Sequence, residues 1–575
     1  NPLFSNPSKV QLYALHSSLS TEEQTRIFQV PQEGVRKIVV STNIAETSIT
    51  IEDVVFVVDT GRVKENRYDD INMMPMLVEC WESLASARQR RGRAGRVRPG
   101  ICFHLFSTMT RQERQIAEFQ LPEMLRTSLD DLILQILLLD LGDPTEFLDK
   151  AVNPPSKVMM ANSINHLTGL QAVESDDTDA VQLTALGYHL ATLPVEPNIG
   201  KMLVYATIFG CVDPVLTIAA SMCSRNPFTA PFEKREEADL AKRRLAYPNS
   251  DHLTLLQAYT LWQEARKDGW AHERAFLREN FLSWNTLQMI SQMRKQFRDM
   301  LKDIGFVGRS QKHEIDESNT NSSNIQLIRA VICAGLYPNV LVAPSHLVHS
   351  SDSESKNEAK VGDFSLMSTK GATYIHPMSI NFDSSKLDTR YLVYHEAVKT
   401  SKVYVRDSTT LSPFILILFG GEITVHHEKE VITIDSWLHF KAARKTATLI
   451  KHLRLQMERI LLQKITNPDE DISLSGKKIV IALDSLLGRN QSNCITSLKQ
   501  ISPHINQHSK YSRKSKNTQY RRKNQKTSQL HNNNSKNTHQ PVNANPQQPN
   551  IKSYKEKNSK KKWTKSLGGK SSQNR

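Results

Sequence analysis

The 575-residue sequence contains no continuous apolar run of about 18 residues, the length that a membrane-spanning helix needs. We therefore expect no membrane span. The longest apolar runs, residues 54–58 and 414–419, have the length of strands, and we predict that they are buried strands. The N-terminus has neither a signal peptide nor an initiator Met, which leads us to expect a fragment of a longer protein.

Cysteine is scarce and widely scattered. No two of the six cysteines form a CxxC pair, so the sequence indicates neither a structural zinc site nor a disulfide framework. This usage is typical of a reducing intracellular compartment, and we expect a cytoplasmic protein, with the nucleus as the alternative. The six are Cys80, Cys102, Cys211, Cys223, Cys333 and Cys494.

An excess of positive charge is missing from the body of the chain, although the formal net charge is +15. Residues 501–575 hold 18 of the 74 basic residues and one of the 59 acidic residues, a net charge of +17. The other 500 residues hold 56 bases and 58 acids, a net charge of −2, so the basic balance gives no argument for nucleic-acid binding by the body. The tail is rich in Asn, Gln, Ser and Lys and poor in apolar residues, which predicts disorder over residues 501–575.

Hydrophobic patterning predicts a multidomain protein with α/β, α and β parts in that order. Residues 1–106 alternate helical segments with apolar runs that end in polar residues, the pattern of parallel strands buried on both faces. Residues 120–300 carry leucines at helical spacing, and residues 325–440 return to short strands between turn residues, which predicts a small barrel.

Individual elements follow from the same patterns. We expect strands at 37–41, 54–59, 340–343, 391–396, 402–406 and 414–419, and helices at 21–28 and 83–90. An amphipathic helix is expected through Leu449, Leu453, Met457 and Ile460.

The strongest chemical motif is QRRGRAGR at residues 89–96. It carries several arginines on a glycine-containing turn, and arginine is the side chain best suited to bidentate phosphate contacts. Taken alone, the segment could equally be a basic patch without fixed structure. Two further motifs, STNIAETSITI (41–51) and VVFVVDTGR (54–62), place polar groups after strands, where open α/β sheets bind their ligands.

Together with LHSSLSTEEQTRIF at 15–28, these segments resemble motifs IV, V, Va and VI of DEAH/RHA helicases, in the order found in that family. The likeness covers residues 10–465: residues 183–228 resemble the family's ratchet domain, and residues 373–382 and 403–421 resemble its OB-fold. The resemblance implies a second RecA-like lobe truncated at its N-terminus (1–106), a winged helix (107–175), a helical ratchet domain (176–320) and an OB-fold (321–450). We expect a helical extension (451–500) to follow, and then the disordered basic tail (501–575), which lies outside the likeness.

The resemblance also implies catalytic roles for matching residues. Arg93 and Arg96 match the two arginines that reach the γ-phosphate of ATP, and Gln89 matches the glutamine that positions the attacking water. Phe28 matches the aromatic side chain that stacks on adenine, and Asp59 matches a ribose or adenine contact. The alternatives are a position in the helix core for Phe28 and a turn cap for Asp59.

Further matches concern RNA. Ser48 matches a motif V serine that reports the nucleotide state to the RNA site, and the segment 64–81 falls where the family has a β-hairpin that splits duplexes. The polar sequence of this segment also suits any hairpin. Residues that match RNA-backbone contacts are Thr42, Asn43, Ser17 and Ser18.

Three motifs of the family are absent from the sequence: the phosphate loop GxxxxGK[ST], the DEAH quartet that holds magnesium, and the SAT motif. We therefore expect ATP and Mg²⁺ to be held mainly by a missing first RecA-like lobe, and this chain alone to be inactive. The resemblance implies an intact monomeric motor that couples ATP hydrolysis to 3′-to-5′ movement on RNA. A truncated, non-enzymatic RNA-binding or scaffold protein is the alternative.

Within the family, residues 34–66 and 236–259 look most like a translation-initiation helicase that binds the small ribosomal subunit. Relatives with other RNA targets share much of the same pattern. The small ribosomal subunit is therefore the partner that we expect besides RNA.

Overall fold

The computed structural model describes residues 6, 9–16, 19, 21–47, 50–69, 74–107, 116–175, 180–231, 234–308, 317–348, 360–468 and 474–488. The tail that is predicted to be disordered, residues 501–575, lies outside these ranges. Within the described ranges, every helix is too short or too polar to cross a membrane.

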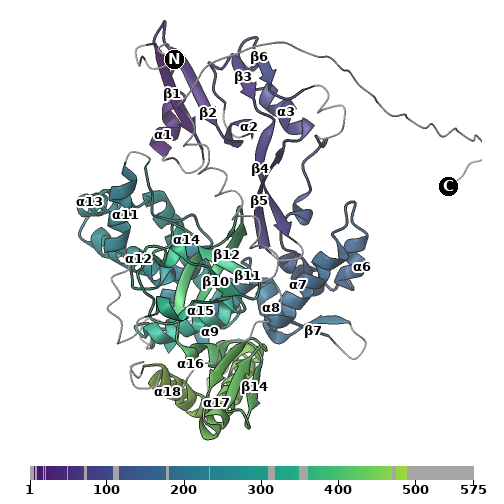
Figure 1. Ribbon diagram of the computed structural model, residues 1–575, viewed down its shortest axis with the longest axis vertical. Coiled ribbons are helices and arrows are strands. Elements are labelled where there is room, and N and C mark those ends of the chain that lie inside the picture. Colours follow the sequence, from purple (N-terminus) through teal and green to yellow (C-terminus); the bar gives the residue numbers. More distant parts are fainter. Residues whose placement is uncertain are drawn as a thin grey trace, which may run out of the picture. The chain divides into compact units, whose positions relative to one another are not determined.

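The N-terminal α/β part contains two parallel strand pairs (Figure 1). β1 (Val10–Leu15) pairs with β2 (Arg36–Ser41), and β3 (Phe56–Asp59) pairs with β6 (Ile101–His104). Their β-branched and aromatic residues favour extended backbone, and the strands predicted at 37–41 and 54–59 are confirmed. The prediction that they are buried on both faces is wrong, because Val40, Phe56 and Val58 are more than 60% exposed. The accompanying helices are α1 (Thr21–Arg26), α2 (Ile44–Thr47) and α3 (Leu84–Arg91).

A long antiparallel hairpin follows the turn after β3. It consists of β4 (Arg62–Asp69) and β5 (Met74–Trp81), so the structure contains the hairpin predicted for residues 64–81. Lys399, the last residue of β12 (Tyr391–Lys399), pairs with Met76, and its ammonium lies 2.7 Å from the carboxylate of Asp69. The hairpin thereby contributes two of the seven strands of a sheet of order β13-β11-β10-β9-β12-β5-β4.

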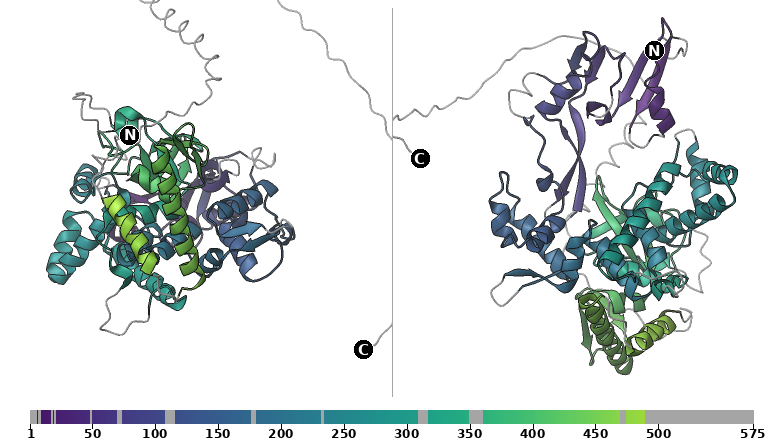
Figure 2. Two further views of the ribbon diagram at one scale, coloured as in Figure 1. Left: turned by 90° about the horizontal axis from the view of Figure 1, so that it is seen from below. Right: turned by 180° about the vertical axis from the view of Figure 1, so that it is seen from behind.

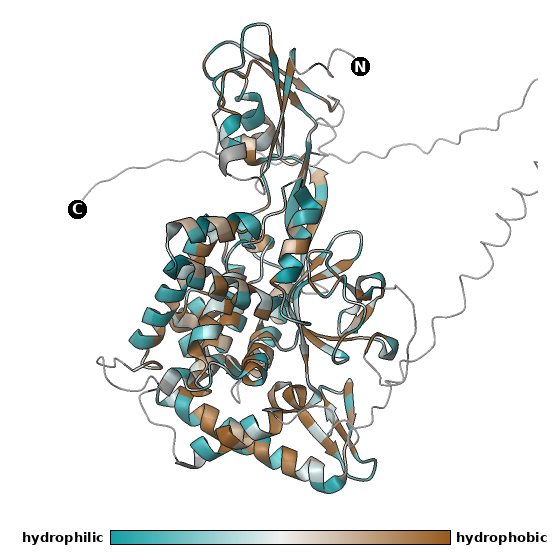
Figure 3. Cartoon of the chain, turned by 90° about the vertical axis from the view of Figure 1, so that its left-hand side faces the viewer, coloured by the Kyte–Doolittle hydropathy of each residue, from teal (hydrophilic) through white to brown (hydrophobic). Residues whose placement is uncertain are grey.

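The helical part has a continuous hydrophobic core. α9, α10 and α15 are buried along nearly their whole lengths. Longer helices such as α14 bury one face, and Figure 3 shows hydrophilic and hydrophobic residues interspersed along the helices. The helices are α5 (Asp130–Leu138), α6 (Pro144–Asp149), α7 (Lys157–Gly169), α8 (Ala185–Thr192), α9 (Pro197–Ile208), α10 (Val212–Met222), α11 (Arg235–Arg244), α12 (Asp251–Lys267), α13 (Trp270–Glu279), α14 (Trp284–Asp303) and α15 (Ile325–Leu336). Short 3₁₀ helices are η1 (Glu123–Leu125), η3 (Glu317–Asn319), η4 (Ser345–Leu347) and η5 (Val361–Asp363).

A small hairpin separates the first three of these helices from the rest. Its strands, β7 (Val173–Ser175) and β8 (Val181–Leu183), are antiparallel. The hairpin therefore crosses residue 175, where the sequence led us to expect the boundary between winged helix and ratchet domain. The winged-helix assignment itself stays a prediction.

The β-rich part begins after α15 with short strands, and the strands expected at 340–343, 391–396 and 402–406 are confirmed. Its longest ladder joins β12 antiparallel to β13, from Tyr391↔Leu411 to Lys399↔Val403. The remaining strands of this sheet are β9 (Val340–Val342), β10 (Leu366–Ser368), β11 (Gly371–Ile375) and β13 (Val403–Leu411).

The prediction of a strand at residues 414–419 is wrong, because this segment forms helix α16 (Pro413–Phe419). Ser412 accepts the N–H of Ile415 as an N-cap, and Pro413 occupies the first helical position. A short apolar run suits a buried strand or a buried helix equally, and here the Ser-Pro start selects the helix. Its buried residues pack into the main hydrophobic core.

The last described elements are a three-stranded antiparallel sheet and two helices. The strands are β14 (Ile423–His426), β15 (Val431–Ile434) and β16 (Leu438–Lys441). α17 (Arg444–Thr466) and α18 (Leu474–Gly488) lie side by side in both views of Figure 2. The expected amphipathic helix is present, but Leu449 is 68% exposed, so the predicted face is correct for Met457 and wrong for Leu449.

Candidate functional site

The arginine motif occupies the end of α3 and the turn that follows it. The helix begins after the N-cap residue Ser83 and ends at Gly92. Within the turn, Ala94 is only 2% exposed and anchors the backbone to the core. The turn therefore has a defined position, with Arg93 and Arg96 on either side of a buried residue, and the alternative of an unstructured basic patch does not hold.

Arg93 and Arg96 lie close enough to influence each other electrostatically. Burial and then the positive charge of Arg96 lower the pKa of Arg93. Arg96 is exposed and donates a hydrogen bond to the hydroxyl of Thr50, which lies in the STNIAETSITI motif. Two neighbouring guanidinium groups suit an anion with several oxygen atoms, such as a phosphate group. Gln89 is exposed on α3, and its predicted contact with water stays a prediction.

Arg90, which is not among the residues predicted from the sequence, joins three other segments. Its Nε lies 3.1 Å from a carboxylate oxygen of Glu46 on α2 and 2.8 Å from one of Glu82, which precedes α3. Its Nη1 lies 2.9 Å from the carboxylate of Asp59 at the end of β3. These ion pairs fix α3, and with it the arginine turn, against the ends of α2 and β3. In the sequence, the feature that could have indicated this role of Arg90 was an acidic residue, Glu82, directly before the N-cap of the helix that carries Arg90.

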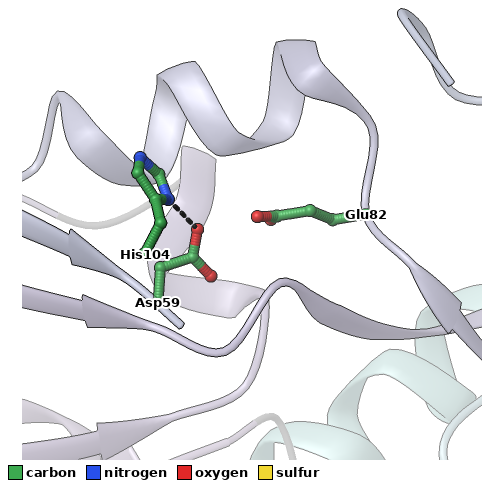
Figure 4. A group of neighbouring side chains, drawn as sticks. All are labelled: Asp59, Glu82 and His104. Carbon is green, nitrogen blue, oxygen red and sulfur yellow. Dashed lines mark hydrogen bonds and ion pairs between the residues drawn. The ribbon is translucent and has the colours of Figure 1, made fainter. Parts of the chain in front are cut away.

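Asp59 points inward and is 3% exposed. Its carboxylate accepts the N–H of Gly61 at 3.0 Å and lies 3.1 Å from Nδ1 of His104 (Figure 4). Burial by itself would raise the pKa of Asp59, but hydrogen bonds from Glu82, the Gly61 N–H and Arg90 hold that pKa below its usual value. This geometry fits the turn-cap alternative, and a contact with ribose or adenine stays a prediction.

The turn after Asp59 requires glycine. Gly61 has a φ of 71°, in the left-handed region that other residues rarely adopt. A Cβ atom at this position would also lie 2.5 Å from the ring of Phe106. The DTG segment therefore forms a tight cap between β3 and the hairpin, and it holds Asp59 where Arg90 can reach it.

The other predicted site residues have different surroundings. Phe28 is 50% exposed just beyond α1, so the alternative of a position in the helix core is wrong. Thr42 and Asn43 are exposed and follow β2 directly, at the end of a parallel strand where ligand groups gather. The remaining predicted residues, Ser17, Ser18 and Ser48, lie outside the described residues.

One group of side chains in the described part of the chain has the spacing of metal ligands. It consists of Asp59, Glu82 and His104, whose nearest ligand atoms all lie within 4.8 Å of one another (Figure 4). Arg90 already supplies a positive charge to both carboxylates, so a cation would have to compete with a guanidinium.

A small cavity of about 70 Å³ lies beside this group. It is smaller than the pockets of roughly 300 Å³ or more that hold typical small-molecule ligands. The cavity therefore cannot accept a nucleotide. Its lining residues are Leu84, Ala87, Arg88, Arg91, His104 and Phe106.

Four regions of the chain match known protein families. Residues 2–98 match the helicase conserved C-terminal domain, residues 196–255 the ratchet-like helicase associated domain (HA2), residues 328–423 the OB-fold family, and residues 430–488 the C-terminal domain in RNA helicases. The expected RecA-like lobe, helical ratchet and OB-fold are thereby confirmed. The match to the helicase conserved C-terminal domain contains every predicted site residue. The match to the C-terminal domain in RNA helicases begins at residue 430, before the end of the OB-fold expected at residue 450.

Curated helicases are similar to this chain over most of its length. The ATP-dependent DNA/RNA helicase DHX36 of Homo sapiens is 42% identical over 463 residues, which are 80% of this chain and 44% of that protein. The ATP-dependent RNA helicase DHX29 of Homo sapiens is 40% identical over 486 residues, 83% of this chain and 34% of that protein. The DExH-box ATP-dependent RNA helicase DExH1 of Arabidopsis thaliana is 43% identical over 489 residues, 85% of this chain and 47% of that protein.

The chain therefore spans less than half the length of these relatives. Their identities to the chain are too similar to favour one of them.

Proposed function

We propose that this chain, which carries the domain set of the C-terminal portion of a DEAH/RHA helicase, forms the part of an ATP-dependent RNA helicase that brings two arginines to the γ-phosphate of ATP. The observation that carries the proposal is the turn after α3. There Arg93 and Arg96 lie near each other, and Arg90 fixes the turn to the ends of α2 and β3. Because the chain spans less than half of its relatives, the activity belongs to the complete protein.

In this role, Arg93 and Arg96 neutralise the negative charge that develops on the γ-phosphate during hydrolysis. Gln89 orients the attacking water, and Phe28, which is exposed, stacks on adenine. Mg²⁺ would supply further neutralisation of the phosphate oxygens. Glu46, whose charge acts on Arg93, is already paired with Arg90, so we assign the ion no ligand in this chain.

The proposal extends to RNA, which the names of all three relatives include. Thr42 and Asn43, together with Ser17 and Ser18, contact the sugar-phosphate backbone and give sequence-tolerant binding. The hairpin β4–β5 separates the strands of a duplex, and ATP hydrolysis drives movement in the 3′-to-5′ direction by a monomer. Ser48 links the state of the nucleotide to the RNA site.

As the setting we propose translation initiation on the small ribosomal subunit in the cytoplasm. The support is the sequence likeness of residues 34–66 and 236–259 to a translation-initiation helicase. Sedimentation of the complete protein through a sucrose gradient tests this part. We expect it to move with purified small subunits in a salt-resistant complex, and sedimentation at the position of free protein would contradict the assignment.

RNA-stimulated ATP hydrolysis by the complete protein tests the catalytic proposal. We expect Arg93→Ala or Arg96→Ala to lower kcat by about 10³, the scale of an arginine-finger loss. Arg98→Ala, which removes an exposed arginine just beyond the turn, is the control and should leave kcat near that of wild type. This chain alone should hydrolyse ATP no faster than background.

Two outcomes would contradict parts of this proposal. Variants of Arg93 and Arg96 with kcat within a few-fold of wild type would refute the role of the turn. A complete protein that binds RNA but shows no RNA-stimulated hydrolysis would favour the alternative of a non-enzymatic RNA-binding or scaffold protein.

A further inference from the structure

Glu82 is a buried carboxylate to which the proposed mechanism gives no role. It lies between the last residue of β5, Trp81, and the N-cap of α3, Ser83. Its side chain is 0% exposed, and neither of its oxygen atoms accepts a hydrogen bond, although Nε of Arg90 lies 2.8 Å from Oε2. A buried carboxylate anion without hydrogen-bond donors is costly, so the charge of Glu82 requires an explanation.

The neighbouring elements contribute five charged or titratable groups that face Glu82. These groups are Glu46 of α2, Asp59 of β3, Arg90 of α3, and Cys102 and His104 of β6. If every carboxyl group were ionised, three negative charges would surround one guanidinium. Such an excess of buried negative charge is relieved when one carboxyl group keeps its proton.

The hydrogen bonds indicate which carboxyl group keeps it. Asp59 accepts hydrogen bonds from the Gly61 N–H and from Arg90, and Glu46 accepts one from Arg90, so both are stabilised as anions. Glu82 accepts none, and its carboxyl group lies with an oxygen within 4.8 Å of an oxygen of Asp59. In agreement with this assignment, burial and then the hydrogen bond to Asp59 raise the pKa of Glu82 to about 8.

We propose that Glu82 is a positioning residue whose proton bridges to Asp59, and that this carboxyl–carboxylate pair holds Arg90, and therefore the arginine turn, in place. The proposal rests on the proposed function, because it concerns the placement of Arg93 and Arg96. The link is short, since the N–H of Arg93 donates to the carbonyl oxygen of Arg90 at 3.0 Å. When Glu82 loses its proton, repulsion from Asp59 displaces the start of α3, and the turn moves with the helix.

The direction of the pH dependence follows from the raised pKa of Glu82. In the unfolded chain this group has the ordinary pKa of 4.5, so folding takes up a proton between about pH 4.5 and pH 8. The stability that the pair contributes is complete below pH 4.5 and is lost as the pH rises through about 8. Loosening of α3 is therefore expected on the alkaline side.

Hydrogen–deuterium exchange of the α3 amides in the 575-residue chain tests the proposal, with exchange expressed as protection factors to remove its intrinsic pH dependence. We expect the protection of wild type to fall about tenfold between about pH 7 and pH 9. Glu82→Gln, which is neutral at every pH, should keep its protection. Glu79→Gln removes an exposed carboxyl group from β5, the strand that precedes Glu82, and should behave like wild type.

Several results would overturn the proposal. One is an equal pH profile for wild type and Glu82→Gln, and another is a transition that is kept in Glu82→Gln but abolished in His104→Gln. Zn²⁺ that increases α3 protection in wild type and not in Glu82→Gln would show that a cation replaces the proton. If Glu82→Gln does not fold, the wild-type profile alone decides, because a profile without a transition near pH 8 contradicts the assignment.

Measurement of ATP hydrolysis by the complete protein distinguishes failure of this proposal from failure of the proposed function. We expect kcat of wild type to fall above about pH 8 and kcat of Glu82→Gln to stay level, with KM for ATP similar in the two. An exchange transition in a complete protein without ATPase activity would refute the proposed function and support the carboxyl pair. ATPase activity without an exchange transition would support the function and refute the pair.

Discussion

In the α/β part, the carboxylates of Glu46, Asp59 and Glu82 surround a single guanidinium, whereas in the body Asp251 accepts its hydrogen bonds from neutral donors. Asp251 begins α12 and is 4% exposed. Its carboxylate accepts the backbone N–H groups of Ile380 and Ser408 at 2.9 Å each, together with the Ser379 hydroxyl. The contacts of Asp251 fasten the helical part to the barrel.

The difference concerns what each network does. The hydrogen bonds of Asp251 come from backbone and hydroxyl groups, so this contact is suited to holding two parts together. Burial and then the charge of Asp251 raise the pKa of the neighbouring Asp407 to about 6. A cluster with more acids than bases depends on where its protons lie, so the cluster around Arg90 can respond to its surroundings. We therefore assign the first network to stability and the second to the placement of functional side chains.

The α/β part and the helical part also differ in how many of their apolar side chains are exposed. In the α/β part, Phe28 is 50% exposed, and Phe56 and Phe103 on the paired strands β3 and β6 are 64% and 52% exposed. In the helical part, nearly every residue of α9 and α10 is buried. Substitutions in the first region should therefore change binding or activity with little effect on stability, and substitutions in the second should do the reverse.

The largest effect on stability is expected for Asp251→Ala. This change leaves the N–H groups of Ile380 and Ser408 buried without their acceptor, which should lower the free energy of unfolding by about 3 kcal/mol. Denaturant unfolding followed by circular dichroism measures it, with Asp239→Ala on the exposed face of α11 as control. If both variants unfold at the same denaturant concentration, the network around Asp251 does not have the structural role that the comparison gives it.

A smaller effect per pH unit is expected on the acid side, from His252. Burial lowers its pKa from 6.5 to about 3, and its Nδ1 lies 2.7 Å from the Thr409 hydroxyl. The unfolded chain therefore binds a proton that the folded chain excludes, and stability that is complete above pH 6.5 is lost as the pH falls towards 3. The expected slope is about 1.4 kcal/mol per pH unit in this range.

Thermal unfolding as a function of pH measures this contribution. His252→Gln should have a flatter profile below pH 6.5 than wild type, and His272→Gln, an exposed position on α13, should not. The comparison then predicts opposite behaviour for the two buried networks: the body loses stability in acid, and the α/β part loosens in alkali. Acid profiles that are identical in wild type and His252→Gln would remove this contrast.

Phe28→Ala is expected to have a moderate effect, confined to the nucleotide. Loss of one base-stacking contact costs about 1–3 kcal/mol, so the affinity of the complete protein for a fluorescent adenine nucleotide should fall about tenfold. The denaturant midpoint should not move, because the side chain is half exposed. Val30→Ala, a nearby exposed apolar position, is the control, and equal affinities for the two variants would contradict the stacking role.

Deletion of the basic tail is expected to have the smallest effect at physiological salt. It extends the comparison of regions from buried charges to the long-range attraction between the protein and RNA phosphates. Deletion of residues 501–575 removes a net charge of +17 from a body of −2. If the tail contacts RNA phosphates, the slope of log K against log salt should flatten by about 0.7 for each lost contact on single strands. The kcat at saturating RNA should stay near that of the undeleted protein, and equal salt slopes would assign the tail another task, such as nuclear localisation.

Local patterns in the sequence were sufficient for most of the elements. Strands such as β2 and β3 follow from continuous apolar runs, and QRRGRAGR shows arginines beside glycines, although only the resemblance to a family gave these arginines their roles. These features are predictable because each depends on residues that are neighbours in the chain. The strand predicted at 414–419 is wrong for the same reason, since the run was weighed without the Ser-Pro pair before it.

Only the folded structure decided which groups surround Arg90 and which way Asp59 points. Glu46 and Asp59 lie 44 and 31 residues from Arg90 in the chain, and no periodicity relates them. Their meeting depends on how β3, α2 and α3 pack, and burial then determines which carboxyl group is ionised. Spacing along the chain specifies chemistry within one element, but the energy of a buried charge depends on partners that come from others.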